Sequence, residues 1–154
     1  MSDEIKAERQ LVVFDLGGEH YGVDIGTVRE IILMQDITHV PNTPESIEGV
    51  INLRGRIVPV VDLRKRFGLT AGELTKDSRI VVVDIGQVDI GVIVDAVAEV
   101  LRIPANSIEP ASLVITTSDS YYLEGIANLG ERLIIILDLS KALATDASAA
   151  ELAA

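Results

Sequence analysis

The sequence predicts an all-β fold in which a small β-barrel unit occurs twice. Short runs rich in Val and Ile recur along the chain, and these residues favour strands. The run Ile57–Val61 carries apolar side chains on both faces of its pleat, so it needs cover on both sides, as in a closed barrel. The two halves of the chain also align with each other, and each supplies about five short strands.

Two ungapped alignments define the internal repeat. Residues 11–41 match residues 80–110 at nine of thirty-one positions, and residues 48–63 match residues 124–139 at seven of sixteen. The identities include glycines, aspartates and an asparagine, which aliphatic composition alone would not align. The two registers differ by seven residues, which predicts an insertion in the second copy between Pro110 and Glu124.

The repeat sets the predicted organisation of the chain. We expect a tail over residues 1–9, a first barrel repeat over 10–75, a second over 76–143 with strands possibly exchanged between barrels, and a tail over 144–154. Lys76-Asp77-Ser78 is the expected link between the halves. The polar loop Ala111–Ser120 belongs to the second copy, and the alanine-rich segment Ala142–Ala154 is compatible with a C-terminal helix.

In the first copy, two strands flank a Gly-rich hairpin turn, and capping-box spacing over Thr27–Glu30 predicts one helical turn after them. The Thr43-Pro44 pair can start a further turn. The expected strands are Leu11–Leu16, Tyr21–Ile25, Ile31–Met34, Ile37–Val40, Ile47–Leu53 and Ile57–Val61.

The last strand of the first copy carries two local signals. Pro59 lacks an amide hydrogen, which places it at a sheet edge or a bulge. Asp62 can cap a short helix over Leu63–Phe67, which Gly68 would end. The expected strands of the second copy are Ile80–Ile85, Ile90–Val94, Val97–Ile103, Leu123–Leu129 and Leu133–Leu137.

Composition limits the classes of function. No apolar run approaches the roughly 20 residues of a membrane helix, and the N-terminus is charged where a signal peptide is apolar, so we expect a cytoplasmic protein. The absence of cysteine excludes disulfides, thiolate nucleophiles and cysteine–zinc sites. A net charge of −11 argues against nucleic acid as the main partner.

Motifs for catalysis are scarce. His20 and His39 lie in no metal-ligand spacing, no phosphate-binding glycine loop is present, and no serine lies in a nucleophile elbow. Aspartates recur at equivalent positions of the two copies, which favours turn and cap chemistry, although carboxylates that meet only in space stay possible as an active site. We expect no enzyme activity, no cofactor and no metal.

The two copies differ at one informative place. Arg54-Gly55 in the first copy aligns with Gly130-Glu131 in the second, so the fold does not require an arginine there. Glu30 has a counterpart in Glu99, and an Arg54–Glu30 ion pair would hold the guanidinium at a surface. The alternative is that Arg54 braces its own barrel.

The motif Gly-x-Ile-Asn-Leu-Arg-Gly-x-Ile-Val-Pro-Val-x-Asp-Leu-Arg over Gly49–Arg64 resembles that of the CheW family of bacterial chemotaxis coupling proteins. The resemblance extends through Tyr21–Ile25, Asn42-Thr43-Pro44 and Tyr122–Gly125, and covers about Gln10 to Leu143. It implies two intertwined five-stranded SH3-like barrels. It also implies a non-catalytic adaptor between membrane chemoreceptors and the regulatory domain of the histidine kinase CheA, associated with receptor arrays and without membrane insertion.

By motif position, the resemblance assigns binding residues on two surfaces. The residues implied for binding receptor tips are Ile25, Val28, Glu30, Asn52, Leu53 and Arg54. Those implied for binding the kinase are Ile37, Val40, Glu109, Leu113 and Val114. The sequence departs from family members that carry a basic residue before the second proline and an aromatic residue shortly after it. Ile25 and Val28 could instead belong to the barrel core.

Other assignments remain open from sequence. The chain could be the coupling domain of a larger CheW–receiver or CheA-type protein, but it has neither a receiver-like αβ repeat nor a kinase ATP motif. A small β-barrel enzyme or ligand carrier is the alternative from another class. Co-sedimentation with receptor-containing membranes distinguishes this last alternative from an adaptor.

Overall fold

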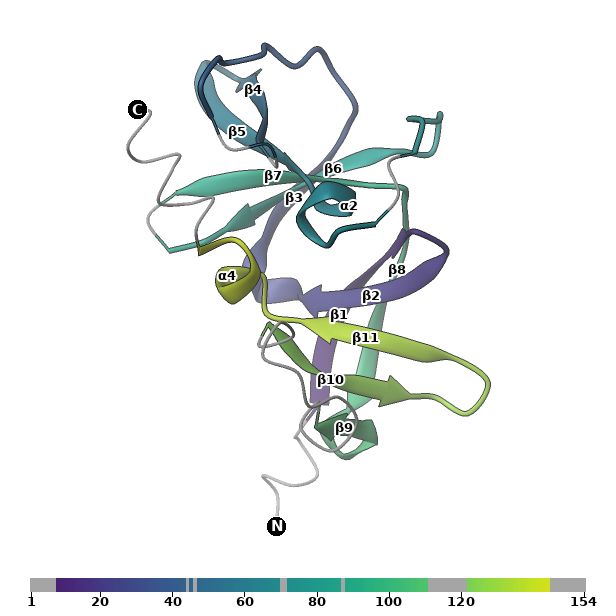
Figure 1. Ribbon diagram of the computed structural model, residues 1–154. Helices are drawn as coiled ribbons and strands as arrows, with labels where there is room; N and C mark the ends of the chain where they lie inside the picture. The colour runs from purple at the N-terminus through teal and green to yellow at the C-terminus, as the bar shows by residue number, and fades with distance from the viewer. Residues whose placement is uncertain are drawn as a thin grey trace.

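The computed structural model describes residues 8–43, 45, 47–69, 72–86, 88–110 and 122–144. Strands dominate it, with a few short helical turns (Figure 1). The strands are β1 (Glu8–Leu16), β2 (Glu19–Asp24), β3 (Val28–Leu33), β4 (Ile47–Leu53), β5 (Arg56–Asp62), β6 (Arg79–Asp84), β7 (Asp89–Val94), β8 (Ala96–Pro104), β9 (Ile108–Pro110), β10 (Leu123–Asn128) and β11 (Leu133–Leu137). The helical turns are η1 (Ile25–Thr27), α2 (Leu63–Arg66), η2 (Ala105–Ser107) and α4 (Leu139–Ala142).

The strands form two sheets that do not follow the two halves of the chain. The six-stranded sheet has the order β8-β1-β2-β11-β10-β9, and the five-stranded sheet has the order β3-β6-β7-β5-β4. The hairpin β1–β2 therefore lies among strands of the second half, and β6–β7 among strands of the first (Figure 1). Parallel pairs β2–β11 and β5–β7 join the halves in each sheet. The predicted all-β, intertwined fold is confirmed, with β9 as a sixth strand on one sheet.

Each sheet has its own apolar core, and a third core lies between the sheets. Residues such as Ile51, Val60 and Ile80 form the core of the five-stranded sheet, while Leu11 and Ile134 belong to the core of the six-stranded sheet. The largest cluster combines residues from both sheets with the helical turns α2 and α4. Strands therefore bury apolar side chains on both faces, as the sequence predicted.

The repeat is visible in the irregularities of the sheets. The ladder between β3 and β6 shifts at Arg29, and the ladder between β8 and β1 shifts at the equivalent Ala98. The hairpins β4–β5 and β10–β11 shift in the same way before Gly49 and Gly125. Because each bulge recurs at an aligned position, the two units share their backbone path as well as their sequence.

The close packing around two glycines corrects one part of the alignment. A Cβ on Gly49 would lie 2.2 Å from the Thr38 carbonyl oxygen, and one on Gly125 would lie 2.6 Å from the Glu109 carbonyl oxygen. Thr38 and Glu109 are thus equivalent, although their numbers differ by 71 rather than 69. Two of the seven extra residues of the second copy therefore precede Pro110, which is not the structural partner of Pro41.

Two predicted elements of the first copy were misplaced. The helical turn lies at η1 and shares only Thr27 with the predicted Thr27–Glu30, because β3 pairs with β6 from Val28 onward. Ile37–Val40 is not a strand: only Thr38 bridges to Val50, with its N–H donating at 2.8 Å and its carbonyl accepting at 2.9 Å. One bridged residue is too short to count as a strand.

The prediction that Pro59 lies at an edge or a bulge is wrong, whereas the predicted cap of the helix after β5 is confirmed. Pro59 lies in an interior strand, but the pairing of β5 with β7 begins after it, at Val60. The Asp62 carboxylate accepts the Arg64 N–H at 2.9 Å and caps α2, and Gly68 follows with a φ of 72°. The predicted loop Ala111–Ser120 and the tail beyond residue 144 lie outside the described residues.

Candidate protein-binding surface

The turn between β4 and β5 presents Arg54 to solvent. Arg54 and Gly55 have φ values of 51° and 87°, the left-handed pair that tightly turned hairpins need. The Asn52 side-chain oxygen accepts the Gly55 N–H at 2.8 Å and fixes the turn. A positive φ is unfavourable for arginine, whereas the second copy has Gly130 here, with a φ of 86°. Arg54 thus occupies a position that the backbone alone would assign to glycine.

Arg54 forms the predicted ion pair with Glu30. Its Nη1 donates to Glu30 Oε1 at 3.2 Å, and its Nη2 contacts Oε2, so the guanidinium binds the carboxylate in a two-pronged manner. The Arg54 side chain is 68% exposed and that of Glu30 is 27% exposed. Hydrogen bonding from Arg54 is the main reason that the pKa of Glu30 lies below its ordinary value. At this exposure the pair orients the guanidinium more than it stabilises the fold.

Further charges surround this pair, and sequence reasoning missed them. Arg29 donates to Asp89 at 2.8 Å and to Asp84 at 3.2 Å, and Arg56 donates to the other oxygen of Asp89 at 3.1 Å. One sequence signal could have revealed them. Arg56 is identical to Arg132 in the repeat alignment, which marks a second arginine near the turn. The surface is therefore a set of paired charges around one highly exposed guanidinium.

The apolar candidates divide between surface and core. Ile25 is 38% exposed and lies outside the core clusters formed by the described residues, so its core alternative is not supported. Val28 is partly buried and packs against the core between the sheets. Asn52 is exposed but holds the turn, and Leu53 is buried inside the five-stranded sheet. The structure thus joins Glu30 on β3 to Arg54 at the facing hairpin, while Ile25 begins η1 and Val28 begins β3.

The equivalent surface of the second copy is built differently. Glu99, the counterpart of Glu30, accepts a hydrogen bond from Arg132 at 2.8 Å. Arg132 corresponds to Arg56, so the guanidinium comes from the strand side of the turn and not from its apex. The apex residue Gly130 carries no charge, and its N–H donates to Asn128 at 3.1 Å.

The candidate kinase contacts lie at equivalent edges of the two sheets. Ile37 lies beside Gly49 of the edge strand β4, and Glu109 lies on the edge strand β9, beside Gly125 of its neighbour β10. Val40 follows Ile37 by three residues and lines a cavity. Leu113 and Val114 lie outside the described residues.

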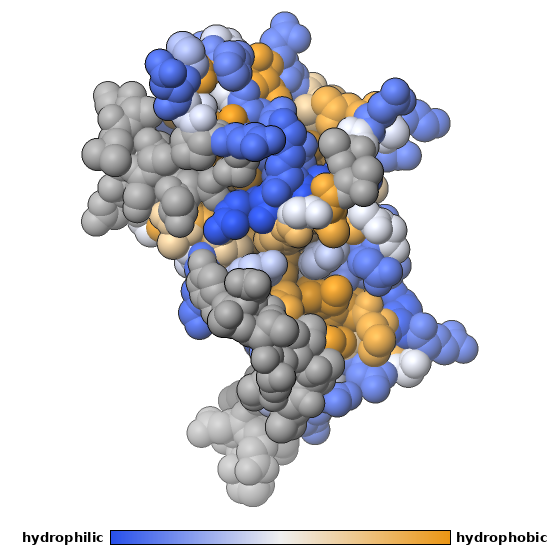
Figure 2. Space-filling view, in the orientation of Figure 1, coloured by the Kyte–Doolittle hydropathy of each residue, from blue (hydrophilic) through white to orange (hydrophobic). Residues whose placement is uncertain are grey.

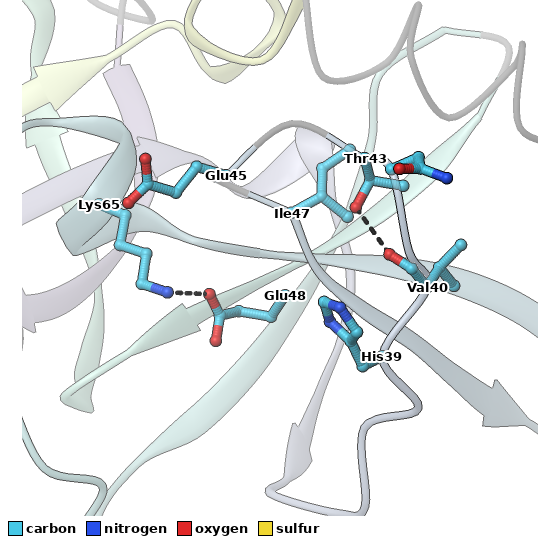
Figure 3. A pocket seen from close by; sticks show the side chains of 8 residues that line it. His39, Val40, Thr43, Glu45, Ile47, Glu48 and Lys65 are labelled. Atoms are coloured by element: carbon cyan, nitrogen blue, oxygen red, sulfur yellow. Dashed lines mark hydrogen bonds and ion pairs between the residues drawn. The ribbon is translucent and has the colours of Figure 1, made fainter.

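Val40 lines an open cavity of about 350 Å³ (Figure 3). Lys65 donates to Glu48 at 2.6 Å across it, and the Thr43 hydroxyl donates to the Val40 carbonyl at 3.0 Å. His39, Asn42, Glu45 and Ile47 complete the lining. Within the described residues, no three His, Asp or Glu side chains are grouped as they would be around a metal ion.

An exposed apolar area lies over β11 in the lower half of Figure 2. Leu133, which begins that strand, is 58% exposed, and its equivalent Ile57 on β5 is 67% exposed. Ile31 and Val100 form a second exposed pair at equivalent positions. Both copies therefore have an exposed apolar side chain near the start of the second strand of this hairpin, whereas only the first copy has an arginine at the turn.

Comparison with known proteins identifies the family. The family model of the CheW-like domain matches residues 10–147. The chain belongs to the CheW-like family. A chemotaxis protein CheW of Klebsiella aerogenes is 39% identical to it over 138 residues, which cover 90% of this chain and 83% of the relative. CheW of Bacillus subtilis is 34% identical over 148 residues, which cover 96% of this chain and 95% of the relative.

A solved structure agrees with both sequence and fold. The crystal structure of the scaffolding protein TtCheW from Thermoanaerobacter tengcongensis has a TM-score of 0.80 and 48% identity, and the match covers 88% of this chain and 92% of that one. The chain is thus a chemotaxis scaffold of the CheW type and not an enzyme. None of the helices in the described ranges has the length and apolarity that a membrane-spanning helix requires.

Proposed function

We propose that this protein couples chemoreceptors to the histidine kinase CheA as a cytoplasmic adaptor. In this proposal the helical tips of receptors bind the surface that contains Ile25, Val28, Glu30 and Arg54, and the regulatory domain of CheA binds the sheet edges near Ile37 and Glu109. The protein would lie in receptor arrays at the inner membrane through these contacts and would insert no segment of its own.

The Arg54–Glu30 pair is the observation that carries the receptor side. It holds a guanidinium at the apex of a tight turn, at a position whose counterpart in the repeat is glycine. Ile25, on η1 before β3, offers an exposed aliphatic side chain, which suits one face of a helix. A charged group beside such an apolar contact sets the orientation of the partner and excludes wrong partners more than it adds affinity.

The kinase side is supported by the position of the sheet edges. Ile37 lies beside Gly49 of the edge strand β4, and Glu109 lies on the edge strand β9, whereas Arg54 lies in the turn between β4 and β5. A protein with separate surfaces for two partners can bind both at once. Contacts that are individually weak then combine into a stable assembly, because the second contact becomes intramolecular.

A pull-down with a receptor-tip fragment and the regulatory domain of CheA, separately and together, tests the proposal. We expect the wild-type chain to retain each partner alone and both together. Arg54→Glu should lose the receptor fragment and keep the kinase domain, whereas Glu109→Lys should do the reverse. Retention of neither partner by the folded wild-type chain would contradict the proposal.

A further inference from the structure

Two crossovers carry the chain from one sheet to the other, and they occupy equivalent places in the repeat. The first runs from β2 through η1 to β3, and the second runs from β7 to β8 with one residue between. Ile25 aligns with Val94 in the gap-free part of the repeat. Val94 is fully buried, whereas Ile25 is 38% exposed. The side chain at this repeat position is thus buried in the second crossover and exposed in the first.

A charged clamp accompanies the packing of the second crossover. Arg64 Nε donates to Asp95 Oδ1 at 3.0 Å, and Arg64 Nη2 donates to Asp95 Oδ2 at 2.6 Å. Asp95 Oδ2 also accepts the Gly17 N–H at 2.9 Å, and the Asp95 N–H donates to the Asp15 carbonyl at 2.9 Å. Arg64 lies on α2, directly after β5 of the five-stranded sheet, while Asp15 lies on β1 of the six-stranded sheet and Gly17 in the β1–β2 turn. This Arg64–Asp95 clamp therefore ties the two sheets together.

The clamp has the features of a strong pair. Both side chains are largely covered, with exposures of 23% for Arg64 and 32% for Asp95. Partial burial raises the pKa of Asp95, but hydrogen bonds from Arg64 and Gly17 together bring it below its ordinary value. A two-pronged, charge-assisted contact that is partly shielded from water is stronger than an exposed surface pair.

The first crossover lacks every part of this arrangement. Gly26 stands where Asp95 stands in the second copy, and Ser140 on α4 stands where Arg64 stands on α2. The nearest carboxylate, Asp24, is held by Arg9 of the same sheet at 2.8 Å. Within the described part of the chain, no residue of η1 is buried and no side chain caps its N-terminus.

We propose that the Arg64–Asp95 clamp makes the β7–β8 crossover the fixed joint between the sheets and leaves the β2–η1–β3 crossover, with Ile25, as the side that opens. Segments with few buried contacts and no cross-sheet bonds open at the lowest free energy. Opening at η1 moves Ile25 and Val28 while the clamped side holds the sheets together. The inference goes beyond the proposed function and stands without it, because it concerns motion in the free protein.

Amide hydrogen exchange on the full chain tests this directly. In the wild type, the Val28 amide should exchange about tenfold or more faster than the equivalent Val97 amide. Arg64→Gln should raise exchange about tenfold at Gly17 and Asp95, whose amides report the clamp, while Ile134 in the six-stranded core keeps its rate. The control is Arg132→Gln, which breaks an ion pair within the six-stranded sheet and should leave Gly17 and Asp95 unchanged.

A second variant moves the clamp to the open crossover. A Cβ on Gly26 would meet no atom within 4 Å, and Ser140 is exposed, so the double substitution Gly26→Asp with Ser140→Arg fits the repeat geometry. It should slow exchange of the Val28 amide about tenfold, and neither single substitution should do so.

Three results would overturn the proposal. One is equal protection of Val28 and Val97 in the wild type. Another is an Arg64→Gln variant that exchanges faster everywhere, with Ile134 included, or nowhere. The last is a transplanted pair that slows exchange no more than its single substitutions.

Discussion

The β4–β5 hairpin and the β10–β11 hairpin share a bulge, a turn-fixing asparagine and a nearby carboxylate, yet they neutralise that carboxylate in different ways. In the second copy, Arg132 on the returning strand binds Glu99. In the first, the corresponding Arg56 binds Asp89, and Glu30 is bound by Arg54 at the turn. A barrel of this type can therefore pair its carboxylate without an arginine at the apex.

The difference separates what the fold requires from what the first copy adds. Arg54 accepts an unfavourable left-handed backbone and remains mostly exposed, so it gains little stability from its position. A residue that is costly for the backbone and unnecessary in the sister unit is best explained by a contact outside the chain. Exposed Ile57 and Leu133, by contrast, occur in both copies and do not distinguish them.

The largest expected effect comes from reversing the charge at the apex. Arg54→Glu should weaken binding to receptor-containing membranes by about tenfold or more, because it places a carboxylate against Glu30 and removes the orienting guanidinium. Co-sedimentation measures the binding, and the thermal melting curve should stay close to that of the wild type. Arg132→Glu, the matched change in the other hairpin, should leave receptor binding intact. Loss of the native melting transition in Arg54→Glu would instead make the arginine structural.

Restoring the pair with opposite polarity should recover part of that loss. Adding Glu30→Arg to Arg54→Glu returns an ion pair to the surface, so the double variant should bind receptor membranes better than the single one. The same co-sedimentation assay detects this. Simple addition of two losses would show that the residues do not act together.

Truncation at the two crossovers should affect stability unequally. Val94→Ala removes fully buried methyl groups and should lower the free energy of unfolding by about 2 kcal/mol, whereas Ile25→Ala should cost less than about 1 kcal/mol, although it removes more atoms. Denaturant unfolding of both variants measures the difference. Equal costs would mean that Ile25 is packed in solution.

The smallest effect concerns pH. Because hydrogen bonding from Arg54 lowers the folded-state pKa of Glu30, the pair stabilises the folded protein above the ordinary pKa of glutamate. That contribution is lost as pH falls through the lowered pKa. An NMR titration of the Glu30 carboxyl carbon should therefore move to higher pH in Arg54→Gln. Arg132→Gln should leave the Glu30 titration unchanged, and a shift there would show that the two hairpins are coupled.

The sequence predicted the features that depend on local pattern. Alternation and the repeat predicted the strands, and Asp62 predicted the cap of α2 through its position before a helical run. The Arg54–Glu30 pair was predicted because both residues stood out when the copies were compared. These features depend on residues whose roles are visible within a few positions or across one alignment.

Features set by long-range contacts could not be predicted from local pattern. The exchange of hairpins between sheets was implied only by the family resemblance, because it depends on parallel pairing between distant strands, which no local signal encodes. The spacing of Thr27–Glu30 suited a capping box, but pairing of β3 with β6 prevailed and placed the turn earlier. The Arg64–Asp95 clamp joins residues 31 apart in sequence, which only the arrangement of both sheets brings together. The repeat alignment alone therefore revealed neither the clamp nor its absence from the other copy.

An NMR titration of the labelled protein with a receptor-tip fragment tests the central claim most directly, because it compares the equivalent surfaces in one experiment. The account predicts shifts for Ile25, Val28, Glu30 and Arg54, and none for their repeat equivalents Val94, Val97, Glu99 and Gly130. Shifts at the second set without the first, or at both sets equally, would contradict the assignment of receptor binding to the copy that carries Arg54.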